Sequence, residues 1–154
     1  HRVYRTVKNT GLAVVLDKGE YSNIHPVDKQ PVGERLALQA MYHAYGLDNE
    51  VRAFGPFYQS CYTLQSYIWL IFNHARDGII CTGENPLGFE VAGQDKVFYP
   101  ADSVQIQGNK VRLFSANVKE PVYARYNWRN YAEVNMFGKN GLPMAPFRTS
   151  MNDE

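Results

Sequence analysis

The chain has 154 residues, of which 45% are hydrophobic and 20% charged, so it fits one folded domain, or one small domain with a piece of another, and general disorder is excluded. No stretch approaches the ~18 consecutive apolar residues of a membrane span, and a net charge of +1 without a dense Lys/Arg cluster excludes a nucleic-acid footprint. We therefore expect neither nucleic acid nor membrane as a partner. The 14% aromatic content favours a β-rich body whose surface can stack on sugars or protein, although ordinary sheet packing is the stronger explanation.

The first third of the chain follows an α/β pattern. Residues 12–16, Leu-Ala-Val-Val-Leu, form a continuous apolar run typical of a strand buried on both faces. A polar loop over 17–29 leads to a helix with Pro31 near its first turn and Gly46 as its C-cap. The expected apolar stripe of this helix is Val32, Leu36, Ala40 and Ala44. Because such a strand needs neighbouring strands, residues 1–49 are predicted to be the last strand and helix of a larger α/β domain of which the rest lies outside this chain.

From Val51 onward the hydrophobic period changes to two, so residues 50–154 are predicted to form an all-β domain. This number of short strands in about a hundred residues favours an antiparallel β-sandwich, with a barrel as the alternative. Residues 135–154 are expected to be an extended tail lying on other structure. The candidate strands are 53–58, 61–73, 79–82, 88–92, 97–99, 103–107, 110–115 and 122–128.

The clearest hairpin has Gly108-Asn109 as its two-residue turn, with Gly in the first central position of a type II′ turn. This turn sets the register of its two strands. Apolar partners then fall on one face and polar partners on the other, which predicts a half-buried sheet. The expected pairs are Gln107 with Lys110, Ile106 with Val111, and Val104 with Leu113.

Two cysteines, Cys61 and Cys81, match no zinc-site spacing and are too few for a disulfide scaffold. A single bridge and two buried thiols both remain open. His43 and His74 have no Cys or acidic neighbours at metal-ligand spacing, so each is expected to be packed or exposed. Trp69 lies in an apolar run and is expected in the core.

His25 stands in the loop between the buried strand and the helix, where open α/β sheets place their ligand sites. Pro26 follows it, so a rigid turn is expected to hold the backbone there. On position alone, a surface or capping histidine is the competing interpretation.

Two groups of segments carry a family resemblance. The first comprises residues 9–17, 23–26 and 29–36, and the second comprises residues 55–58, 87–93, 126–128, 140–143 and 146–149. In order and over nearly the whole chain, they resemble sialate O-acetylesterases of the SGNH hydrolase superfamily. The first group is similar to the C-terminal catalytic block of that family, and the second to its β-rich C-terminal region.

The resemblance implies hydrolysis of O-acetyl esters on a carbohydrate such as an acetylated sialic acid, with no metal or organic cofactor. The resemblance also implies that His25 is the catalytic histidine, which takes the proton of an attacking serine and returns it to the sugar alcohol that leaves. Ser22 and Asn23 occupy positions where the family carries an aspartate. Asp17 is therefore the candidate orienting acid, with Glu20 or a backbone carbonyl as alternatives.

The nucleophile is the second departure from the family, because no serine of this chain stands in the expected Gly-Asp-Ser or Gly-Gln-Ser-Asn setting. The serines are Ser22, Ser60, Ser66, Ser103, Ser115 and Ser150. We expect an N-terminal companion segment or chain to carry the nucleophile, and this chain alone to be inactive.

Asn23 and Trp128 are the candidate substrate-binding residues, Trp128 because with Arg129 and Tyr131 it offers a stacking surface for a sugar. A secreted or periplasmic location is expected, with any targeting segment removed or outside this sequence, which begins at His1. The alternative function is a noncatalytic carbohydrate-binding or structural β-sandwich module.

Overall fold

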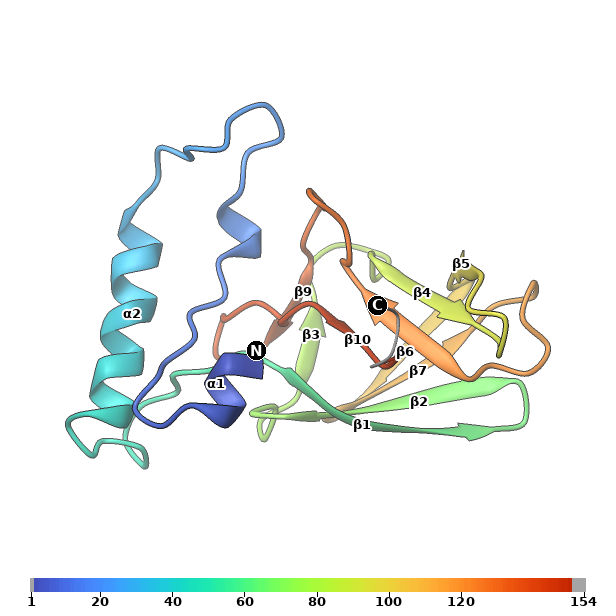
Figure 1. Ribbon diagram of the computed structural model, residues 1–154, viewed down its shortest axis with the longest axis horizontal. Helices are drawn as coiled ribbons and strands as arrows, with labels where there is room; N and C mark the ends of the chain where they lie inside the picture. Colours follow the sequence, from blue (N-terminus) through green and yellow to red (C-terminus); the bar gives the residue numbers. More distant parts are fainter. Residues whose placement is uncertain (1, 151–154) are drawn as a thin grey trace.

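The computed structural model describes residues 2–150, which form a helical N-terminal part beside a larger β body (Figure 1). The N-terminal part contains helix α1 (Arg2–Thr6), the 3-10 turn η1 (Leu16–Lys18) and helix α2 (Gln30–His43). None of the helices within residues 2–150 has the length and apolar character needed to cross a bilayer.

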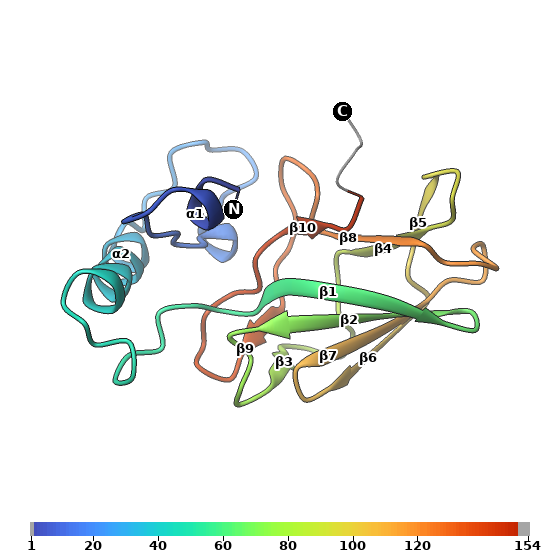
Figure 2. The same cartoon turned by 60° about the horizontal axis from the view of Figure 1, so that its bottom comes forward.

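The β body is built from antiparallel strands, as the sequence predicts. Two four-stranded sheets, in the orders β1-β2-β7-β6 and β10-β8-β4-β5, stack into a sandwich, and a two-stranded sheet pairs β3 with β9 (Figure 2). An α/β domain is not shown. The strands are β1 (Phe57–Leu64), β2 (Tyr67–Asn73), β3 (Ile79–Cys81), β4 (Phe89–Ala92), β5 (Phe98–Pro100), β6 (Ser103–Gln107), β7 (Lys110–Phe114), β8 (Tyr123–Tyr126), β9 (Met136–Gly138) and β10 (Phe147–Arg148).

The main core lies between the two large sheets. Alternate residues of β2, among them Ile68 and Leu70, are fully buried against Val91 and Tyr126 of the opposite sheet. Trp69 belongs to the other face of β2, so its predicted place in the core is wrong. An apolar run does not reveal which of its residues face outward, and the pleat turns Trp69 to the outer surface.

That outer surface gives Trp69 partners of its own. It stacks on Tyr62, with ring centroids 6.0 Å apart and an interplanar angle of 4°. The Arg112 guanidinium lies over its ring at 5.6 Å.

The Gly108-Asn109 hairpin is confirmed, with Val104 opposite Leu113 and Ile106 opposite Val111. Gly108 has a φ of +61°, as the first position of a type II′ turn requires. The prediction of one strand over 61–73 is wrong, because the chain turns back at Gln65 and Ser66 to make the β1–β2 hairpin.

The predicted strand over 12–16 does not form. A strand needs a neighbour for its backbone groups, and the described residues offer this segment none. Side chains of α2 take the place of that neighbour. Gln39 Oε1 accepts a hydrogen bond from the Leu12 N–H at 3.0 Å, and Arg35 Nη1 donates to the Val14 carbonyl at 2.7 Å.

Helix α2 has the predicted position but not the predicted buried face. Its buried residues are Arg35 and Gln39, the two side chains that bind the neighbouring segment. Leu36, in the middle of the predicted apolar stripe, is 55% exposed. Leu36 therefore faces away from the β body, and the inward face is mixed: Arg35 and Gln39 are buried beside Leu38 and Tyr42, which pack against a small apolar cluster that includes Phe54.

The C-terminal segment is more than an extended tail, because it supplies β9 and β10 and buries Met144 and Phe147 in the main core. Residues 151–154 of the predicted tail lie outside the described residues. Cys61 and Cys81 are free, half-buried thiols, so the unbridged alternative is the one that holds.

An acidic residue in the β10-β8-β4-β5 sheet makes the stability of this sheet depend on pH. Glu90 accepts hydrogen bonds from Arg125 Nε and Nη2 at 2.8 and 3.2 Å, and Arg129 Nη2 lies 3.4 Å away. Burial alone would raise the pKa of Glu90, but Arg125 and then Arg129 outweigh it, so the pKa lies below its ordinary value of 4.5.

The stability contributed by Glu90 is therefore expected to be complete above about pH 4.5 and to disappear as the pH falls through the lower folded-state pKa. Urea unfolding of the wild-type and Glu90→Gln proteins, at neutral pH and in acid, measures this. The difference between the two proteins should shrink in acid, whereas the exposed control Glu120→Gln should differ little from wild type at either pH. A Glu90→Gln difference that does not change with pH would contradict this account.

Candidate functional site

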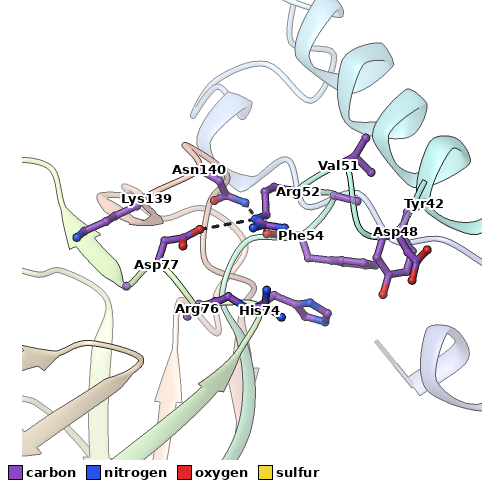
Figure 3. A pocket seen from close by; sticks show the side chains of 13 residues that line it. Tyr42, Asp48, Val51, Arg52, Phe54, His74, Arg76, Asp77, Lys139 and Asn140 are labelled. Atoms are coloured by element: carbon purple, nitrogen blue, oxygen red, sulfur yellow. Dashed lines mark hydrogen bonds and ion pairs between the residues drawn. The ribbon is translucent and has the colours of Figure 1, made fainter. Parts of the chain in front are cut away.

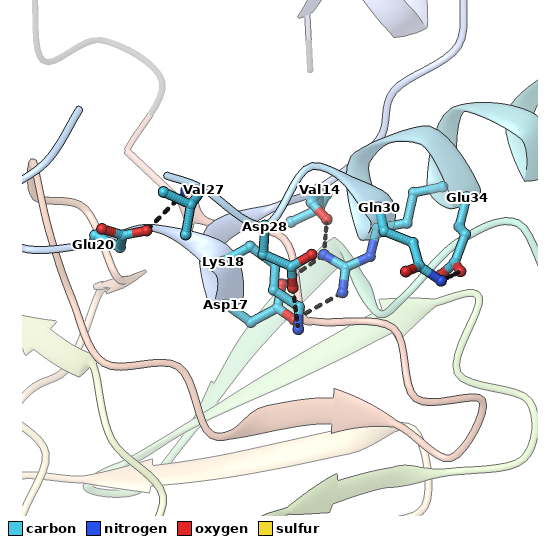
Figure 4. A network of polar contacts seen from close by, with 9 residues as sticks. Val14, Asp17, Lys18, Glu20, Val27, Asp28, Gln30 and Glu34 are labelled. Atoms are coloured by element: carbon cyan, nitrogen blue, oxygen red, sulfur yellow. Dashed lines mark hydrogen bonds and ion pairs between the residues drawn. The ribbon is translucent and has the colours of Figure 1, made fainter. Parts of the chain in front are cut away.

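His25 lies in an exposed loop between η1 and α2, and the polar side chains of Asn23 and Glu20 fix this loop. Figure 4 shows the contact of Glu20 with Val27. Asn23 Oδ1 accepts a hydrogen bond from the His25 N–H, and Asn23 Nδ2 donates to the His25 carbonyl, both at 2.9 Å. Glu20 Oε2 accepts from Asn23 Nδ2 at 3.2 Å, and Glu20 Oε1 accepts from the Val27 N–H at 2.9 Å. The backbone around His25 is thus held while its imidazole stays open to solvent.

The bonds made by Asn23 show what an amide, and not a carboxylate, does at this position. An ionised carboxylate only accepts hydrogen bonds, whereas Asn23 donates to both the His25 carbonyl and Glu20. Asn23 is therefore a residue that positions the loop. Its predicted contact with substrate stays a prediction.

Asp17 is placed in η1 and bound to α2. Its two carboxylate oxygens accept hydrogen bonds from Arg35 Nη1 and Nη2 at 2.6 and 2.7 Å, and both side chains are about nine-tenths buried. Within residues 2–150, neither Asp17 nor Glu20 makes a hydrogen bond or an ion pair with the His25 imidazole. The predicted pairing of His25 with Asp17 is not made in this structure and stays a prediction.

Trp128 begins the long loop between β8 and β9, and the Arg148 guanidinium lies 5.0 Å from the centre of its ring. The loop over residues 19–29, which carries His25 and is called the histidine loop below, is contacted by the same β8–β9 loop. The Tyr131 and Tyr21 rings meet edge to face there, with centroids 5.4 Å apart. The structure thus brings together parts of the two regions that the sequence analysis treated as separate domains.

Below this contact lies a cleft of about 580 Å³, which the sequence reasoning missed. Three segments line it: η1 with Gly19, the β3–β4 loop and the β8–β9 loop. No sequence motif predicts this cleft, since its residues are common loop types that lie far apart in the chain. The lining residues are Leu16, Asp17, Gly19, Thr82, Gly83, Glu84, Asn85, Leu87, Tyr131, Ala132, Glu133, Val134 and Asn135.

A second cavity of about 210 Å³ lies near the C-terminal end of α2 (Figure 3). His74, with a φ of +57°, stacks on Phe54 here at 4.3 Å, and burial lowers the pKa of its imidazole. Asn140 Nδ2 donates to the Phe54 carbonyl at 2.8 Å, and Arg52 pairs with Asp77 at 3.6 Å. His74 is therefore packed against an aromatic ring, one of the two environments expected for it.

Across residues 2–150 no three His, Cys, Asp or Glu side chains gather as metal ligands would. His43 lies on α2 in an aromatic cluster with Tyr4, Tyr42 and Phe54, and its closest ring is Tyr42 at 4.9 Å. His43 and His74 are thus both exposed side chains that contact aromatic rings.

Neither a known family model nor a curated protein matches the chain. Among solved structures, it is similar to a carbohydrate acetylesterase, with 34% sequence identity and a TM-score of 0.84. That protein is XAC1771 from Xanthomonas citri, described as a novel carbohydrate acetylesterase. The match covers 90% of this chain and 32% of XAC1771, so the chain spans about a third of its length. The likeness supports a relationship to esterases that act on carbohydrate.

Proposed function

We propose that this chain is the part of a carbohydrate O-acetylesterase that supplies the catalytic histidine. The similarity to a carbohydrate acetylesterase over 90% of the chain is the observation that carries this proposal. His25 supports it by position, because its imidazole is solvent-accessible on a fixed loop whose Tyr21 borders the cleft at Tyr131.

In this reaction His25 acts as a general base. It takes the proton of a serine hydroxyl as that oxygen attacks the acetyl carbonyl, and it then protonates the sugar oxygen that leaves. Water releases acetate from the serine in the second half of the reaction, again with His25 as base. The proposed substrate is an O-acetylated sugar, and the family resemblance suggests acetylated sialic acid as one such sugar.

The nucleophile is proposed to come from a companion segment that covers the N-terminal part of this chain. Three features support such a partner. Residues 12–15 run without a neighbouring strand, Leu36 leads an exposed apolar stripe on α2, and the histidine loop carries exposed apolar side chains, with Ile24 90% exposed. An α/β sheet that paired with residues 12–15 would bury these surfaces together.

The test is turnover of p-nitrophenyl acetate by the protein isolated from its natural source, with intact-mass analysis of every polypeptide that accompanies it. The assembly should be active, the 154-residue chain alone inactive, and His25→Ala should lower turnover by at least ~10²-fold. The control His43→Ala changes another histidine and should retain activity. An assembly in which His25→Ala is as active as wild type would refute the proposal.

The alternative, a noncatalytic sugar-binding module, is favoured by one observation. The Tyr131 cleft lies within this chain and needs no companion to form. If the natural assembly is inert toward esters while the chain still binds sugar, this alternative replaces the esterase proposal.

A further inference from the structure

The cleft beside the histidine loop is a joint product of the two parts of the chain. Leu16 and Asp17 come from the N-terminal part, whereas Glu84, Tyr131 and Glu133 come from loops of the β body. Its volume of about 580 Å³ lies within the ~300–1,000 Å³ range of small-molecule sites. If His25 is the catalytic base, a sugar held in this cleft lies next to the loop that carries it.

The β-body wall of the cleft is held in place before any ligand arrives. Asn135 fastens its two loops to each other: its Nδ2 donates to the Asn85 carbonyl at 2.8 Å and its Oδ1 accepts from the Leu87 N–H at 3.0 Å. The Asn135 carbonyl also accepts from the Thr82 N–H at 2.8 Å. The Tyr131 ring contacts the Tyr21 ring edge to face. A fixed wall loses little conformational entropy when a ligand binds.

The charges along this wall have one sign. The lining holds three carboxylates and no Lys or Arg. Arg35 neutralises Asp17, but Glu84 and Glu133 are exposed and make no ion pair within residues 2–150. The nearby cations are engaged elsewhere, Lys18 with Asp28 and Arg129 with Glu90.

Carboxylates at a wall with an aromatic side chain can bind a neutral sugar. They accept hydrogen bonds from sugar hydroxyls, and the Tyr131 ring offers a face to the C–H side of a sugar ring. A sugar that bears its own carboxylate meets like charges at the same wall, and nothing in the lining compensates for them.

We propose that this cleft binds the neutral ring of an O-acetylated saccharide, with Glu84 and Glu133 accepting from its hydroxyls, and that it discriminates against O-acetylated sialic acids. This inference rests on the proposed esterase function for its biological meaning. It narrows the substrate class to uncharged acetylated sugars, and so replaces the acetylated sialic acid that the family resemblance suggests.

The test is a heteronuclear NMR titration of the full 154-residue chain with methyl 6-O-acetylglucoside and, separately, with 9-O-acetyl-N-acetylneuraminic acid. At low ionic strength the neutral sugar should shift the amides of Thr82, Tyr131 and Asn135. The sialic acid should bind at least ~5-fold more weakly, the size expected for two carboxylates acting on a third through water. High salt should narrow this gap.

The variant E84Q/E133Q removes both free carboxylates and should bring the two affinities together. The matched control E50Q/E120Q removes two exposed carboxylates elsewhere and should keep the preference of the wild type. Equal or tighter binding of the sialic acid by the wild type, shifts confined to residues outside the cleft, or a preference that survives E84Q/E133Q would each overturn the inference. Because the titration reads binding by the chain itself, its result is independent of whether the natural assembly proves to be an esterase.

Discussion

Replacing Arg35 with methionine is expected to destabilise the N-terminal part by about 3–5 kcal/mol. The Arg35 guanidinium makes two charge-assisted hydrogen bonds to Asp17 and one to the Val14 carbonyl, and the two side chains are only 10% and 12% exposed. Methionine fills similar volume but leaves the Asp17 carboxylate buried without a partner. Hydrogen exchange of the α2 amides measures the loss where it occurs.

The matched control for this change is Lys18→Met, at the residue next to Asp17 in η1. Lys18 pairs with Asp28 at 3.7 Å, but these side chains are 34% and 55% exposed, so solvent screens the pair and its loss should cost no more than about 1 kcal/mol. If the two substitutions destabilised α2 equally, the buried pair would not be what holds this helix to residues 12–17.

The second large effect is expected at Gly55, where the chain enters β1. An alanine Cβ there would overlap the Pro143 carbonyl oxygen and lie 2.9 Å from that of Leu142. These atoms are backbone and cannot rotate away, and Ala145 N–H binds the Pro56 carbonyl at 3.0 Å beside them. We expect Gly55→Ala to lower the free energy of unfolding by roughly 3 kcal/mol or more.

Denaturant unfolding followed by tryptophan fluorescence reports this change in the β body. The control is Gly33→Ala in α2, where nothing lies within 4 Å of the added methyl group. Since alanine is the better helix former, this substitution should stabilise the helix by about 0.5–1 kcal/mol. A Gly55→Ala protein with wild-type stability would show that the 142–143 segment moves aside without cost.

The β body was largely predictable because its signals are local. Gly108-Asn109 carries both the turn type and the register, and alternate burial along β7 follows from that register. The β1–β2 turn was missed because Gln65 takes its left-handed φ of +56° without the glycine that usually marks such a turn. Two strands joined by two ordinary polar residues are difficult to distinguish from one long strand.

The N-terminal part was less predictable because its hydrophobic pattern is typical of a strand and helix packed inside a larger α/β domain, and the described residues do not form such a domain. The apolar run 12–16 and the stripe with Leu36 were interpreted as core, yet here one is extended without a strand partner and the other is exposed. The most buried side chains of residues 2–50, Arg35 and Gln39, are polar, and no hydrophobic pattern detects them. Leu38 and Tyr42 pack beside them against the cluster around Phe54, outside the predicted stripe.

Of the candidate site, only His25 was predicted from the sequence. His25 was found from its loop and its resemblance, and the structure places it on a fixed backbone. The partner of Asp17 was not found because Arg35 lies eighteen residues away on another element. The cleft was not found because it depends on how three segments meet, which no single stretch of sequence encodes.

The hydrogen bonds of Asn135 that join the β3–β4 and β8–β9 loops have a consequence for how the loop sequences of this protein can change. One side chain makes the loops over 82–87 and 131–135 a single rigid piece, carried by the sandwich, while His25 is carried by a separate loop. Under the proposed function, the paired loops that contact the sugar and the loop that carries His25 therefore have different supports. Exchange of the paired loops is then expected to alter which saccharide is accepted while the backbone around His25 keeps its geometry.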